Sequence, residues 1–135
     1  QRGGSVSPSF TLARYPGTMP TPVFLTIDTE LMWRHHAAGM PTAAIVRASL
    51  EPAGVGVAYQ LDVLARHGLK ATFFVDPMPA LVHGLDHVKR VVGAILEGGQ
   101  EVQLHLHPNW TGACASDRRR HARFELIEYS AHEQR

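Results

Sequence analysis

Residues 71–77, Ala-Thr-Phe-Phe-Val-Asp-Pro, carry the strongest local signal for secondary structure in the chain. The β-branched and aromatic residues predict a short buried strand, and Pro77 ends it because proline lacks the N–H donor that a central strand requires. A helix is predicted before this strand, because apolar residues recur at helical spacing over residues 57–64 and Gly68 stands where a C-terminal cap belongs. The rest of the fold can be built outward from this helix and strand.

A first strand is predicted upstream of that helix. Residues 23–27, Val-Phe-Leu-Thr-Ile, form an apolar run that ends in Asp28-Thr29-Glu30, as expected of a buried strand with carboxylates at its end. A long loop to about Gly54 is expected to join it to the helix. The Gly-, Pro- and Ser-rich residues 1–22 favour an irregular lead-in.

A second helix and a third strand are predicted downstream. Asp86 is expected to cap the helix, and residues 101–107 follow as the strand. The apolar residues that share one face of this helix are Val88, Val91, Val92, Ile95 and Leu96. Strand, helix, strand, helix, strand at these lengths predicts an α/β fold of parallel strands, with the functional residues at their carboxyl ends.

Composition limits the partners of the chain. It has 135 residues, 44% of them hydrophobic and 19% charged, with a net charge of +1. These values predict one globular domain and give no global reason to expect nucleic acid or an anionic membrane as partner. No apolar run is long enough for a membrane span and no signal peptide is visible, so a cytoplasmic location is the default expectation. The only cysteine is Cys114, which excludes an internal disulfide.

Two pairs of side chains fall at the predicted carboxyl edge. Asp28 and Glu30 end the first strand, and His105 and His107 end the third. Residues two apart on a strand share a side, with Cα atoms roughly 6.5 to 7 Å apart, so each pair can serve a single site. Either pair alone is more often a cap or a surface charge. Their coincidence at one edge favours a metal site of two imidazoles and one carboxylate, with the other carboxylate free to act as a base.

Three stretches of the sequence resemble motifs of a known protein family. They are residues 24–30 (Phe-Leu-Thr-Ile-Asp-Thr-Glu), 68–75 (Gly-Leu-Lys-Ala-Thr-Phe-Phe-Val) and 101–110 (Glu-Val-Gln-Leu-His-Leu-His-Pro-Asn-Trp). In order and spacing they are similar to the opening motifs of the polysaccharide deacetylase (NodB-homology) family. Residues 127–135 are similar to the segment that follows in one branch. The resemblance implies an incomplete (β/α) barrel, of which residues 23–135 would form the first three βα units.

The resemblance also implies a function. It is the metal-dependent removal of N-acetyl groups from a sugar or polysaccharide, with Asp28 as the base and with Glu30, His105 and His107 as ligands of a divalent ion, zinc being expected. Many members have consecutive aspartates and histidines three residues apart, and in that spacing Asn109 would take the place of His107. Trp110, like Trp33, is a candidate to stack on a sugar ring, and packing of loops is the other reading for both.

Later family motifs are not visible in the sequence: an arginine that orients the base and a histidine that acts as general acid. The chain is therefore expected to be a C-terminally truncated part of such a domain and to have little activity alone. A capping-box pattern at Ser130-Ala131-His132-Glu133, which begins a helix close to the last residue, supports this expectation. A module that binds carbohydrate without turnover is the alternative function. The basic residues 118–123 are read as a solvated loop.

Overall fold

The computed structural model describes residues 21–53, 55–113 and 123–134. Outside these ranges lie most of the expected lead-in, Cys114, and the basic stretch of residues 118–123 with the exception of Arg123. The strands are β1 (Thr26–Thr29), β2 (Thr72–Val75) and β3 (Glu101–Leu104). The helices are α1 (Trp33–Ala37), α2 (Thr42–Leu50), α3 (Val57–His67), α4 (Ala80–His83) and α5 (Asp86–Glu97), with two 3₁₀ turns, η1 (Pro108–Gly112) and η2 (Leu126–Glu128).

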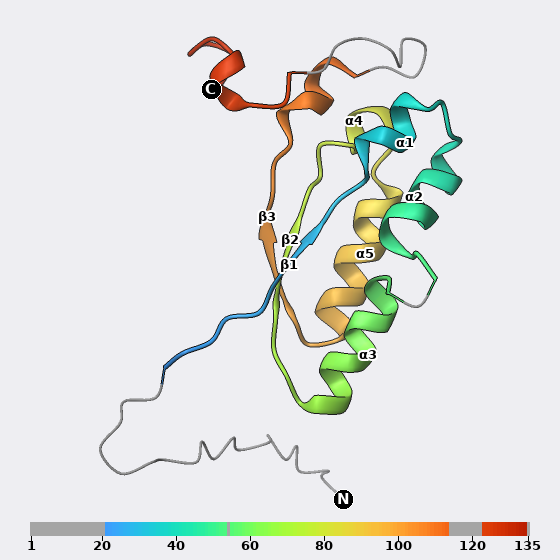
Figure 1. The fold of residues 1–135 in the computed structure, drawn as a ribbon, viewed down its shortest axis with the longest axis vertical. Helices are drawn as coiled ribbons and strands as arrows, with labels where there is room; N and C mark the ends of the chain where they lie inside the picture. The colour runs from blue at the N-terminus through green and yellow to red at the C-terminus, as the bar shows by residue number, and fades with distance from the viewer. Residues whose placement is uncertain (1–20, 54, 114–122, 135) are drawn as a thin grey trace, which may run out of the picture.

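The three strands form one parallel sheet in the order β1-β2-β3, which confirms the predicted α/β class. The register aligns Ile27 with Phe73 and Phe73 with Val102. All labelled helices lie on one side of this sheet in Figure 1, and the carboxyl ends of the strands point toward the end of the molecule that holds the C-terminus. The sheet therefore has one face covered by described helices and one face that is not.

The core lies between the sheet and these helices. Phe73 in the middle strand and Ile95 in α5 are both 0% exposed. Burying side chains of this size is worth about 1.5–3 kcal/mol each relative to leaving them in water. Helix α3 ends as predicted at Gly68, whose φ of 61° is left-handed, with Leu69 N–H donating to the Leu64 carbonyl at 2.9 Å. A residue with a Cβ would be strained at that position.

Several expectations about local structure were wrong. The first strand is Thr26–Thr29 and not residues 23–27, of which Val23 and Phe24 are exposed, and the third strand ends at Leu104 and not at His107. The stretch after β1 is not one long loop, because α1 and α2 lie within it, and α2 buries Ile45 and Leu50 against the core. Asp86 does not cap α5: it is the first helical residue and makes no capping hydrogen bond. Leu96 is 55% exposed, so it lies off the buried face of that helix. Short helices such as α1 and α2 form through tertiary packing, which periodicity alone does not show.

Strand alternation separates the two faces of the sheet. Asp28, Phe74 and Gln103 align in one row on the face without described helices. The next row along the strands is Thr29, Val75 and Leu104, of which Thr29 and Val75 are buried on the helix side. In an open parallel sheet with helices on both faces, the strands carry apolar residues on both sides. The sheet of this chain differs, because its uncovered face carries polar residues. No helix in the described ranges is long and apolar enough to cross a membrane.

Candidate metal centre

Three predicted site residues converge at the carboxyl edge of the sheet. One oxygen of Glu30 and one ring nitrogen each of His105 and His107 all lie within 4.8 Å of one another. The Nε2 atoms of the two histidines are 2.9 Å apart, and His105 Nε2 is 3.7 Å from Glu30 Oε2. His107 Nε2 is in direct contact with the same Glu30 oxygen. The side chains are about a third exposed, so the group can be reached from solvent.

Backbone geometry explains the convergence. Glu30 is one residue past the end of β1, and His105 is one past the end of β3, where its N–H still donates to the Val75 carbonyl at 3.0 Å. His107 has an extended backbone, with φ −108° and ψ 102°, as expected of a residue before proline. Its ring therefore points back toward His105, whereas Asn109, the alternative position, lies within η1 and is 2% exposed.

The three ligand atoms fit a small divalent ion. Atoms bound to a tetrahedral ion at about 2.0–2.2 Å lie roughly 3.3–3.6 Å from one another. Two of the three separations, 2.9 and 3.7 Å, lie on either side of that range, and the third, between His107 Nε2 and Glu30 Oε2, is shorter than it. Two imidazoles and one carboxylate are also a donor set that zinc and related ions accept, with a fourth position left for another ligand. The residues could thus hold a metal ion.

Asp28, the predicted base, lies beside this group and is not part of it. Its side chain is exposed, and it lines a cavity of about 210 Å³ together with Glu30, Ser49 and Gln60. The two carboxylates of the acid pair thus open onto the same cavity. This cavity gives a ligand access to both, at the outer edge of β1 between the sheet and helices α2 and α3.

Asp76 is a candidate that the sequence reasoning missed. It directly follows β2, so it lies one step beyond the last paired row, at the level of Glu30 and His105 on the neighbouring strands. Its carboxylate is 3% exposed, and Oδ1 accepts the Met78 N–H at 2.9 Å. Burial raises the pKa of Asp76, although the N–H of Met78 and the nearby His107 act in the opposite direction. The missed signal was its position, since it ends the middle strand at the edge that carries the other residues.

Trp110 has a structural role in place of the expected contact with sugar. The ring is 1% exposed and packs edge-on against Trp33, with ring centroids 4.9 Å apart. His36 and His83 contact the same indole, at 5.3 and 5.7 Å. A buried indole leaves no face for a sugar ring to stack on. The aromatic group instead joins α1, α4 and η1 above the sheet.

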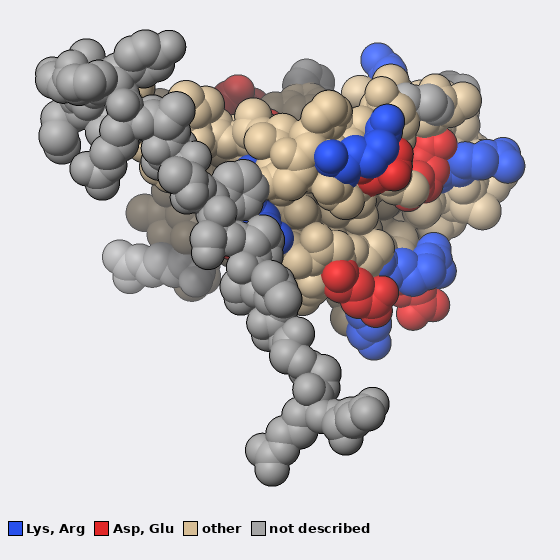
Figure 2. Space-filling model, turned by 90° about the horizontal axis from the view of Figure 1, so that it is seen from below, with Lys and Arg blue, Asp and Glu red and all other residues tan. Residues whose placement is uncertain are grey.

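Neither a protein-family model, nor a curated protein, nor a solved structure matches this chain. On the face seen in Figure 2, acidic and basic side chains are intermixed and no large area has a single sign. The inference of function therefore rests on the group at the carboxyl edge.

Proposed function

We propose that this chain is part of a metal-dependent hydrolase of the polysaccharide deacetylase type, acting on N-acetyl groups of a sugar or polysaccharide. The observation that carries the proposal is the convergence of Glu30, His105 and His107 beside the cavity that Asp28 lines. Consecutive parallel strands with helices on one face also suit the start of a (β/α) barrel, because a doubly wound sheet has helices on both faces.

Each residue has a chemical role in this proposal. Glu30 and the two imidazoles would hold a divalent ion, most simply zinc, which when bound supplies a Lewis acid for the amide carbonyl and lowers the pKa of water. Asp28 would accept a proton from the attacking water, since its exposed carboxylate opens onto the shared cavity. Asp76 would remain behind the ligands without touching the substrate, because it is buried.

Because Asp28 lies outside the three-residue group, a second function is considered, in which the chain binds a metal ion and a glycan without turnover. A chain that binds an ion and a glycan without hydrolysing the amide would need Glu30 and the histidines and would not need Asp28. Only slow acetate release is expected from this chain alone, and loss of that release in Asp28→Asn, with metal binding retained, would assign the carboxylate to turnover. Unchanged release would remove it from the mechanism.

The metal site is tested by titrating the purified chain with Zn²⁺ in a calorimeter. One equivalent is expected to bind, and Glu30→Ala and His105→Ala are each expected to weaken binding by about 100-fold or more, since each removes one of three ligands. His67→Ala, an exposed histidine at the end of α3, is the matched control and should bind as the wild type does. Binding unaffected by both site variants would refute the assignment. Acetate release from an N-acetylglucosamine oligomer then separates the enzyme from the binding module.

A further inference from the structure

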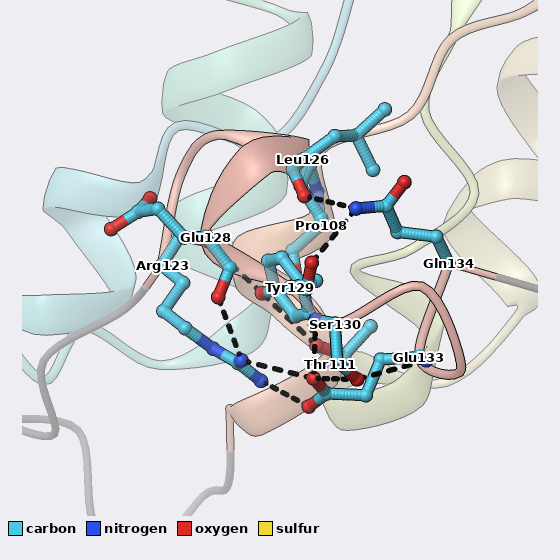
Figure 3. Close-up of polar contacts among 9 residues, drawn as sticks. All are labelled: Pro108, Thr111, Arg123, Leu126, Glu128, Tyr129, Ser130, Glu133 and Gln134. Carbon is cyan, nitrogen blue, oxygen red and sulfur yellow. Dashed lines mark hydrogen bonds and ion pairs between the residues drawn. The ribbon is translucent and has the colours of Figure 1, made fainter.

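One side chain of residues 123–134, that of Tyr129, reaches the turn that follows His107. The side chains of this segment are exposed, Ile127 at 90%, with the exception of Tyr129, which is 8% exposed. The Tyr129 ring points inward from this segment toward η1, the turn that begins directly after His107 (Figure 3). A single buried aromatic in an otherwise exposed segment indicates an anchoring point.

The tyrosine hydroxyl holds the backbone beside the histidine. Tyr129 donates to the Pro108 carbonyl at 2.6 Å, and Thr111 donates to the same carbonyl at 2.8 Å. The Arg123 carbonyl is a second possible acceptor, at 3.1 Å. A phenol donates only one hydrogen, and the shorter distance favours Pro108. The carbonyl one residue beyond a metal-ligand candidate is therefore fixed by two side chains.

Charged side chains hold Tyr129 in this position. The Arg123 guanidinium lies 3.7 Å from the centre of the Tyr129 ring and forms an ion pair of 2.7 Å with Glu133. Glu133 also accepts the Ser130 N–H at 2.8 Å, while Ser130 Oγ lies 3.4 Å from the Glu133 N–H. These are the contacts of the expected capping box, but residues 131–134 form a turn and not the helix that was expected to follow it. The segment is thus closed on itself around the ring (Figure 3).

We propose that residues 123–134 form a latch in which Tyr129 is a positioning residue for His107: its hydroxyl fixes the Pro108 carbonyl and so holds the His107 backbone ready for a metal ion. The inference rests on the proposed metal site. A ligand held in its bound conformation loses less freedom on binding, so the latch raises the affinity of the site without contributing a ligand atom.

The hydroxyl is tested with Tyr129→Phe, which keeps the ring and removes only the donor. The probe is Co²⁺, followed by its visible absorption bands, which report both affinity and ligand geometry. We expect binding to weaken by about fivefold, the size of one net hydrogen bond, and the bands to change in position or intensity. Tyr59→Phe, at an exposed tyrosine of α3, is the control and should change neither.

A second variant opens the latch without touching the hydroxyl. Glu133→Gln removes the ion pair with Arg123 and is expected to weaken Co²⁺ binding in the same direction by a smaller factor. If both variants fold and bind Co²⁺ with the wild-type affinity and spectrum, the latch is overturned and the metal site stands. If the wild-type chain binds no Co²⁺, the metal site fails and the latch fails with it.

Discussion

The helix-covered body of the sheet and its carboxyl edge differ in what they bury. The body buries apolar side chains such as Phe73, Ile45 and Ile95. At the edge, Asp76 and Asn109 are almost completely buried, and Asp76 Oδ2 and Asn109 Oδ1 have no hydrogen bond of good geometry to the described residues. Such polar atoms cost stability, and proteins keep them mainly where function requires them. The buried apolar side chains of the body stabilise the fold, and we expect the functional residues at the edge.

The largest expected effect is a loss of stability from a substitution in the core under the helices. Phe73→Ala removes the central ring of the core and is expected to lower the free energy of unfolding by about 3–5 kcal/mol, because the cavity cannot collapse fully in the middle strand. Urea denaturation followed by circular dichroism measures this. Leu96→Ala, on the exposed side of α5, should change stability by no more than about 0.5 kcal/mol. A loss at Leu96 equal to that at Phe73 would contradict the described core.

A substitution of Asp76 is expected to have an intermediate effect: it should raise stability and weaken metal binding. At neutral pH the charge of this carboxylate is buried, which costs stability, so Asp76→Asn should raise the melting temperature. The same substitution should weaken Co²⁺ binding by about 10-fold, as the loss of groups that support metal ligands does. The control is Asp62→Asn, at the exposed ion pair with Arg66, where neither quantity should change appreciably.

The size of the Asp76 effect on stability also depends on pH. Its pKa is raised above 3.8 by burial, so the folded state keeps its proton where the unfolded state has lost it, and stability falls as the pH rises through that window. The gain in melting temperature from Asp76→Asn should therefore be present at pH 7 and disappear below about pH 3.8. A gain that is the same at both pH values would show that packing, not charge, is the cause.

The smallest expected effect is the contribution of Glu133, in the latch, to the stability of the protein at low pH. Hydrogen bonds from Arg123 and Ser130 lower the pKa of Glu133 from 4.5 to about 2. The unfolded chain takes up this proton first, so the contribution of Glu133 to stability is complete above pH 4.5 and is lost as the pH falls toward 2. Glu133→Gln should remove that part of the acid dependence in thermal melts between pH 5 and about pH 2.5. Glu97→Gln, at an exposed glutamate of α5, is the control.

Parts of the site and fold with strong local signals were predictable. Gly68 marked the end of α3, and Ser130 with Glu133 marked a capping box, because each depends on backbone geometry within a few residues. Helices α1 and α2 were missed since their few apolar residues are buried by contacts from elsewhere in the chain. The contact of Tyr129 with Pro108 and the position of Asp76 near His107 were missed for the same reason: these partners are distant in sequence.

From the sequence alone we could infer the alternation of strands and helices, the parallel sheet and the placement of Glu30, His105 and His107 at one edge. These follow from side-chain periodicity and from the rule that parallel strands end together. Three outcomes came from the tertiary structure: His107 and not Asn109 faces Glu30, Trp110 is buried, and Asp76 is buried near His107 while Tyr129 donates to the Pro108 carbonyl. Those outcomes depend on how chain turns beyond the strand ends pack against one another, and no local pattern encodes that packing.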